Sequence, residues 1–196
     1  MQKIFLIRHG QTTGDVEDRY GGAYDDLLSP EGEQQAIQLS VELKDHGIQQ
    51  IFSSPLKRAQ QTAQALADIT KYKVVTIDGL RERDQYGLLT GMIKSDASKK
   101  YPGLVEQVKN RLNTLPNAES YNDASQRTIV AYNHIMTQLG SCAAVIWHGG
   151  GMRILFRDIL KVGELKTIGD CCWVELHRDS KDSEFEIGKM CRIELH

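Results

Sequence analysis

The sequence lacks any apolar run near the roughly 18 residues that a membrane-spanning helix requires. Its opening apolar segment, residues 4–7, meets Arg8 too soon to serve as the core of a secretory leader. Only four cysteines occur, and none of them forms a C-x-x-C pair, so neither a zinc site nor a disulfide framework is predicted. We therefore expect a cytoplasmic protein with reduced thiols, no metal and no membrane association.

An excess of charge is also missing, because 24 Lys and Arg residues oppose 26 Asp and Glu residues. This balance gives no global positive field that would favour nucleic acid or an anionic membrane. An anionic small molecule would have to be held by a few locally placed cations. Two catalytic signatures are absent as well: the G-x-S-x-G elbow of esterases and the G-x-x-x-x-G-K-[ST] loop of nucleoside triphosphatases. Both classes are therefore excluded.

The pattern of apolar residues predicts one α/β domain covering residues 1–196. Short apolar runs that suit buried strands alternate with segments of helical periodicity, which favours a three-layer α/β/α fold with a mostly parallel central sheet. The last two strands are expected to form an antiparallel hairpin or edge. The predicted strands are residues 4–7, 48–53, 73–77, 143–147, 171–176 and 185–193.

Two helix starts carry the same signal, a serine N-cap followed by proline, at Ser29-Pro30 and Ser54-Pro55. The stretch from about 90 to 122 is the most polar and loop-like part of the chain, and it holds two of the four prolines. We interpret it as an insertion over the end of the sheet rather than as a domain boundary.

Two predicted strands end in histidine followed by glycine. Residues 4–7 lead into Arg8-His9-Gly10, and residues 144–147 lead into His148-Gly149-Gly150. Ligands of parallel sheets bind beyond the carboxyl ends of the strands. A single histidine there is usually structural, but two such histidines beside glycines indicate a site.

A third cation and an acid complete the candidate set. With Ser54 as N-cap, Arg58 lies in the first turn of its helix, where free N–H groups favour an anion and a guanidinium fork suits phosphate oxygens. The alternative is an ordinary exposed arginine. Glu82 and Asp84 follow the third strand, and either could donate a proton to a leaving oxygen; the alternative is a solvated charged loop.

These segments together resemble the histidine phosphatase superfamily, in its phosphoglycerate mutase-like branch with the Arg-His-Gly signature. The similar blocks follow the family's order over residues 3 to about 157. They are Arg8-His9-Gly10-Gln11-Thr12, Arg19-Tyr20-Gly21-Gly22, Leu28-Ser29-Pro30-Glu31-Gly32, Ser53-Ser54-Pro55-Leu56-Lys57-Arg58-Ala59, Leu80-Arg81-Glu82-Arg83, Ala118-Glu119-Ser120-Tyr121 and Trp147-His148-Gly149-Gly150.

The resemblance implies a role for each matched position. His9 would be the nucleophile, and Glu82 the proton donor and later the base. Arg8, Arg58 and His148 would hold the phosphoryl group. The remaining substrate-binding positions that the resemblance implies are Gln11, Thr12, Asp15, Gly22 and Gly149.

Three positions depart from the family's pattern. Asp15 stands where the family usually has asparagine, and a carboxylate there repels the substrate unless it turns away, is protonated or binds a cation. The acid loop is one residue longer between Glu82 and Gly87, which leaves Asp84 as a rival to Glu82. Ala118 replaces the glycine of the Gly-Glu-Ser block, and we expect this change to affect only the local backbone conformation.

The predicted activity is a metal-independent, cofactor-free phosphatase that acts on a small phosphate ester through phosphohistidine at His9. Mutase activity is the nearest alternative, but only about 65 residues separate Glu82 from His148, which is short for a mutase of this family. A phosphate-ester-binding module without turnover is a second alternative, motivated by Asp15. Small sugar phosphates, phosphoglycerates, nucleoside monophosphates, α-ribazole phosphate and phosphoproteins all stay open as substrates, and a homodimer stays open as the assembly.

Overall fold

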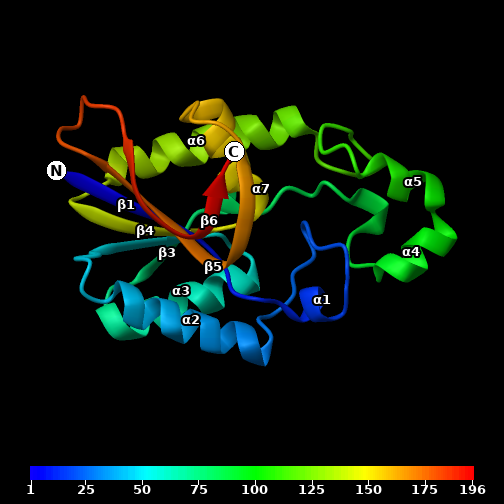
Figure 1. Ribbon diagram of the computed structural model, residues 1–196, viewed down its shortest axis with the longest axis horizontal. Coiled ribbons are helices and arrows are strands. Elements are labelled where there is room, and N and C mark those ends of the chain that lie inside the picture. The colour runs from blue at the N-terminus through cyan, green and yellow to red at the C-terminus, as the bar shows by residue number, and fades with distance from the viewer.

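The computed structural model describes residues 1–196 and places a six-stranded sheet at the centre of the molecule, with helices on both faces (Figure 1). The strand order is β3-β2-β4-β1-β5-β6. The first four strands of this order are mutually parallel, β5 is antiparallel to β1, and β6 is antiparallel to β5. The predicted fold class is therefore confirmed. The strands are β1 (Gln2–Arg8), β2 (Gln50–Ser53), β3 (Val74–Thr76), β4 (Cys142–Trp147), β5 (Leu165–Arg178) and β6 (Glu186–Leu195).

Strand β1 shows how the sequence builds two cores from one sheet. Side chains alternate between the faces of a strand, so Ile4 and Leu6 join the core beneath α6 (Tyr121–Gln138) and α7 (Gly149–Ile154). Phe5 and Ile7 join the opposite core, beneath α2 (Pro30–Leu43) and α3 (Lys57–Thr70). All four are at most 2% exposed, which explains the uninterrupted apolar run in the sequence.

The two serine–proline signals had different outcomes. Ser29 is the N-cap of α2, as predicted: its Oγ accepts the N–H of Gly32 at 3.0 Å, and Pro30 is the first helical residue. Ser54 is not a cap, because α3 begins at Lys57 with Leu56 as its N-cap. Arg58 nevertheless lies in the first turn of α3, where free backbone N–H groups favour an anion, so it stays a candidate phosphate-binding residue.

The segment from 90 to 122 is more ordered than its loop-like sequence indicated. It contains two short helices, α4 (Lys94–Lys100) and α5 (Pro102–Gln107), at the far right of Figure 1. They pack on a small separate core that includes Tyr20, Leu89, Ala97 and Leu115. Because α4 buries only Ala97 and α5 buries no residue completely, neither shows the apolar periodicity that would reveal it.

The remaining short elements connect these layers. They are α1 (Thr13–Val16), two single 3₁₀ turns (Asp78–Leu80 and Gly87–Leu89) and a π-helical turn (Leu155–Ile159) that directly continues α7. The helix predicted over 152–160 is therefore α7 plus this turn, and it begins at Gly149. No helix in the chain combines the length and the apolar character needed to cross a bilayer.

Candidate active site

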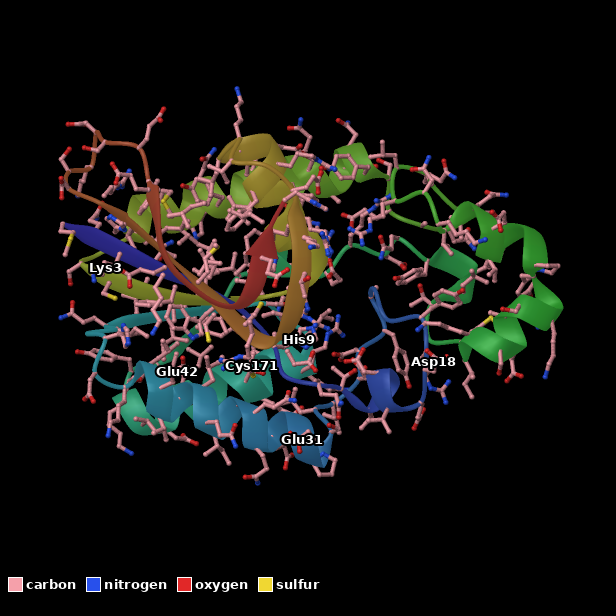
Figure 2. All side chains as sticks on the ribbon, viewed as in Figure 1. Lys3, His9, Asp18, Glu31, Glu42 and Cys171 are labelled. Atoms are coloured by element: carbon pink, nitrogen blue, oxygen red, sulfur yellow. The ribbon has the colours of Figure 1, made fainter.

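A cavity of about 380 Å³ is lined by residues that follow the carboxyl ends of β1 and β4 and by residues of the loops around α1. Figure 2 shows His9, one of its lining residues, at the end of β1 nearer to α1. Its walls carry six basic side chains against three acidic ones, although the whole chain has a net charge of −2. The cavity is therefore a local positive region of the kind that an anionic ligand requires. The basic residues are Arg8, Arg19, Arg58, Lys94, Arg111 and Arg153; the acidic ones are Asp15, Asp26 and Glu82.

His9 follows the last residue of β1 and forms part of the cavity wall, with only 5% of its surface exposed. Its Nδ1 lies 2.7 Å from the carbonyl oxygen of Gly10, and only a protonated nitrogen can donate to a carbonyl. The lone pair is therefore on Nε2, where Arg58 Nε donates to it at 3.2 Å. Burial, and then the charges of Arg58 and Arg8, hold the pKa of His9 well below its usual value, so the ring is neutral.

His148 follows β4, and its ring centroid lies 5.0 Å from that of His9. It has no exposed surface and is not itself among the residues that line the cavity. Its Nε2 pairs with the Ser54 hydroxyl at 2.7 Å. This pairing explains why Ser54 does not cap α3 as the sequence predicted. Its Nδ1 is buried and has no hydrogen-bond partner. Burial and the neighbouring charge of Arg58 lower the pKa of His148 as well. The two predicted strand-end imidazoles thus meet in one place.

Arg58 is 4% exposed and is held by a dense set of acceptors. Its Nη1 donates to the Tyr24 carbonyl at 2.6 Å and to Asp26 Oδ1 at 2.9 Å, and its Nη2 donates to the Gly22 carbonyl at 2.9 Å. The second oxygen of Asp26 accepts the N–H of Gly14 at 3.1 Å. Asp26 is therefore the counter-ion of a buried arginine, and the sequence reasoning missed it.

Arg8 is held from the other side of the site by β5. Its Nη1 contacts Asp170 Oδ1 at 2.9 Å and donates to the Ile168 carbonyl at 3.0 Å. Both partners lie at an irregularity in the β5–β6 pairing, between Ile168 and Trp173, where Cys171 has a positive φ of 48°. Bulges of this type re-aim side chains next to functional sites. Burial raises the pKa of Asp170, and Arg8 opposes that effect.

The structure separates the two candidate acids. Glu82 lines the cavity, where its Oε2 accepts the N–H of Gly150 at 2.9 Å and its Oε1 accepts the N–H of Arg83 at 2.7 Å. Asp84 does not line the cavity; its Oδ1 accepts from Thr90 Oγ1 at 2.7 Å and from the N–H of Gly87 at 3.3 Å. Asp84 therefore shapes its own loop, and the geometry favours Glu82 as the proton donor.

Four of the five further positions that the sequence assigns to substrate binding lie at the cavity. Thr12, Asp15 and Gly22 of the N-terminal region line it, as does Gly149 at the start of α7. Gln11 does not, because its Oε1 accepts the hydroxyl of Ser29 at 2.7 Å at the start of α2. The role of Gln11 in substrate binding therefore stays a prediction.

Asp15 has a structural task that accounts for its charge. Thr12 is the N-cap of α1 and accepts the N–H of Asp15, while Asp15 Oδ2 accepts the N–H of Thr12 at 3.0 Å. This reciprocal capping box favours a carboxylate at its third helical position. The spacing Thr12-Thr13-Gly14-Asp15 was a signal that could have revealed this use from the sequence.

The protein-family comparison agrees with this geometry. Residues 4–187 match the model of the histidine phosphatase superfamily, branch 1. The chain belongs to this superfamily. The resemblance inferred from the sequence blocks is therefore confirmed, and the match covers every residue placed at the cavity.

Members of the histidine phosphatase superfamily that are similar to this chain include both phosphatases and mutases. The "uncharacterized phosphatase PhoE" of Bacillus subtilis is 28% identical over 160 residues, covering 81% of this chain and 78% of its own. The "probable phosphoglycerate mutase GpmB" of Cronobacter sakazakii is 32% identical over 163 residues, covering 82% of this chain and 75% of its own. Sequence similarity thus establishes the family and leaves the reaction to be argued from the site.

Solved structures of this superfamily share the fold over nearly the whole chain. A mycobacterial glucosyl-3-phosphoglycerate phosphatase in complex with inorganic phosphate superposes with a TM-score of 0.78 at 25% identity, covering 96% of each chain. YhfR of Bacillus stearothermophilus gives a TM-score of 0.83 at 21% identity, covering 95% of each chain, which supports the fold alone. In the present structure, no group of three or more His, Cys, Asp or Glu side chains is arranged to hold a metal ion.

Proposed function

We propose that the chain is a phosphomonoester hydrolase that releases inorganic phosphate from a small phosphorylated metabolite through a phosphohistidine on His9. One observation carries the proposal: His9 is a neutral imidazole whose Nε2 lone pair lies in a cavity rich in fixed cations. A nucleophile needs a free electron pair, and phosphoryl transfer needs positive charge fixed around the phosphoryl oxygens. The same small group of residues meets both needs.

In the first step, His9 Nε2 attacks phosphorus and the ester P–O bond breaks. The Nε–H of Arg58, which now donates to His9 Nε2, transfers its hydrogen bond to a phosphoryl oxygen as the substrate enters. His148 adds a further donor at Nδ1 when the Ser54 hydroxyl donates to its Nε2. Glu82 gives its proton to the leaving oxygen, so the product alcohol departs neutral.

In the second step, a water molecule attacks phosphorus on the opposite side from Nε2. Glu82, ionised by the first step, takes a proton from that water, and the N–P bond breaks to release inorganic phosphate and neutral His9. Glu82 is then protonated again and ready for another cycle. Its hydrogen bond from Gly150 N–H fixes the carboxylate at the cavity wall in both steps.

The cations provide most of the transition-state stabilisation in this scheme. Loss of one preorganised donor at a developing oxyanion costs a factor of about 10²–10³ in kcat in comparable sites, and we expect the same range for Arg58→Gln. Arg8 and Arg58 each have a carboxylate partner at 2.9 Å, Asp170 and Asp26 respectively, so we expect Arg8→Gln to fall in the same range.

A panel of phosphomonoesters assayed with a chelator present tests the proposal. Phosphate release that survives chelation and disappears in His9→Ala supports it, whereas activity lost on chelation contradicts the metal-free scheme. His134→Ala is the matched control, because His134 is exposed on α6 and its hydrogen bonds stay within its own helix.

Two rivals are separated by the same preparation. A coupled assay for phosphoglycerate mutase run beside phosphate release identifies a mutase, which must keep the phosphoryl group away from water. Tight binding of phosphate esters without any turnover identifies a binding module. The binding-module alternative was motivated by the carboxylate of Asp15. Because that carboxylate forms the capping box of α1, its presence is no sign of lost activity, and the alternative loses its support.

A further inference from the structure

A second chamber of about 450 Å³ adjoins the active-site cavity. The two spaces share part of their walls, because Gln85, Arg111, Gly150 and Arg153 line both of them. A ligand whose phosphoryl group reaches His9 can therefore extend directly into this second chamber. The proposed reaction uses none of the residues that belong to the second chamber alone.

The second chamber is strongly basic. Five of its lining residues are basic, namely Arg83, Lys109, Arg111, Arg153 and Arg157, and its single acid is Glu164. Glu164 is already engaged, since it accepts from Arg157 at 2.8 Å. The excess of positive charge is therefore held by the other side chains.

Arg111 and Arg153 carry the uncompensated charge. The guanidinium of Arg111 has no hydrogen-bond or ion-pair partner within the chain, and Arg153 donates only to the carbonyl of Leu165. Burial lowers the pKa of Arg153, and the like charge of Arg111 lowers it further. Two arginines that line one space, and that form no ion pair with a carboxylate, gain stability when an anion enters between them.

The surrounding structure holds this pair in place. Arg83 is 5% exposed and donates to the carbonyls of Arg111, Asn113 and Glu119, which fixes the loop that presents Arg111. The π-helical turn Leu155–Ile159 contributes Arg157 to the chamber, and π-helical turns are common at functional sites. Tyr121 also lines the chamber, and the guanidinium groups of Arg83 and Arg157 lie 5.5 and 4.6 Å from the centroid of its ring.

We infer that the second chamber binds a second anionic group of the substrate, a carboxylate or a further phosphoryl group, through Arg111 and Arg153. This inference rests on the proposed phosphatase function and narrows its substrate to phosphate esters that are charged at both ends. One end is cleaved at His9, and the other end fixes the substrate's orientation and is released unchanged. Sugar or alkyl phosphates with no second charged group are then poor substrates, because they leave Arg111 and Arg153 without an anion to bind.

Three alkyl phosphates that differ only at the far end test the inference. The far ends are a carboxylate, a phosphonate, which cannot be hydrolysed, and a neutral carboxamide. We expect kcat/KM of the wild-type protein to be about tenfold or more higher for a charged end than for the carboxamide. A preference for the phosphonate over the carboxylate identifies a second phosphoryl group as the natural end, and the reverse order identifies a carboxylate.

Arg111→Gln is the decisive variant, because this exposed side chain has no partner whose loss would disturb folding. We expect it to reduce the charged-end preference to less than about threefold, with Arg153→Gln acting in the same direction. Lys181→Gln, which removes a positive charge from the exposed β5–β6 turn, keeps the wild-type preference. Equal kcat/KM for the three ends in the wild type, or a preference that persists in Arg111→Gln, overturns the inference.

A binding measurement keeps this test separate from the proposed function. Calorimetry compares an alkyl bisphosphonate with the corresponding alkyl monophosphonate, and neither compound needs to be turned over. We expect tighter binding of the bisphosphonate to the wild type and no such difference in Arg111→Gln. If no phosphate ester is hydrolysed and this difference in affinity is still found, the phosphatase proposal fails but the second chamber is an anion-binding site. Equal affinity of both compounds for the wild type shows that the second chamber does not bind a second anionic group.

Discussion

Asp26→Asn is the substitution that tests most sharply how the site is supported. Asp26 and Arg58 form an ion pair at 2.9 Å in which each side chain is only 4% exposed. Asparagine preserves the shape but removes the charge, and it can accept only one of the two N–H groups that Asp26 accepts, from Arg58 and Gly14. Arg58 is then a buried cation without its counter-ion.

The magnitude follows from the burial. Breaking a buried ion pair from one side costs about 3–5 kcal/mol, whereas a lost hydrogen bond alone costs about 1 kcal/mol. In a chain of this size each kcal/mol moves Tm by about 2–4 °C, so we expect Asp26→Asn to lower Tm by about 6–20 °C. Loss of the fixed position of Arg58 is also expected to lower kcat by as much as about 10²-fold.

Asp25→Asn is the matched control on the neighbouring residue. Asp25 pairs with Lys57 at 3.4 Å, but both side chains are well exposed, and such pairs contribute only about 0–1 kcal/mol. The assays are thermal and urea unfolding of both variants, with steady-state kinetics on the folded proteins. If Asp26→Asn is no less stable than Asp25→Asn, the role of Asp26 as counter-ion is wrong.

Three further predictions concern the same site. Glu82→Gln should lower kcat by about 10²–10⁴-fold and Asp84→Asn by far less, as measured by phosphate release, and equal losses in both variants would contradict the assignment of the acid. His9 and His148 are neutral in the folded state with lowered pKa values, so unfolding takes up two protons below their usual pKa of about 6.5. The free energy of unfolding should therefore fall as the pH drops below about 6.5, by at most about 2.7 kcal/mol per pH unit for the two histidines together. His9→Gln should halve this dependence on pH, and an unchanged dependence in that variant would show that His9 is not held neutral. Asp15→Asn should change kcat/KM by less than about tenfold, because the exposed carboxylate serves the cap of α1 and is screened by salt; a rise of several hundredfold would show that its charge opposes the substrate.

The sheet and three of the main site residues, Arg8, His9 and His148, were predictable because their signals are local. An apolar strand that runs directly into Arg8-His9-Gly10 or into His148-Gly149 must deliver those side chains to the carboxyl edge of a parallel sheet. The cap of α2 at Ser29 was also predictable, since the serine and its proline occupy adjacent positions. Each of these features depends on neighbours within a few residues.

The missed features depend on contacts that are distant in sequence. Asp25 and Asp26 are adjacent and chemically identical, and only the packing against Arg58, 32 residues away, decides which is buried. Asp170 reaches Arg8 through an irregular stretch of β5 that no periodicity reveals. Ser54 has the sequence pattern of an N-cap, but in the structure its hydroxyl pairs with His148, 94 residues away, and it does not cap α3. Helices α4 and α5 went unpredicted because they bury too little apolar surface to show a pattern.

Rapid-quench trapping with a phosphate ester labelled in its phosphoryl group tests the covalent mechanism most directly. The label should appear on His9 within the first turnover as an acid-labile, base-stable phosphohistidine, located by mass spectrometry, and should be absent from His9→Ala. Hydrolysis that proceeds at full rate while His9 never carries the label would show that the neutral imidazole at the end of β1 is not the group that accepts phosphorus.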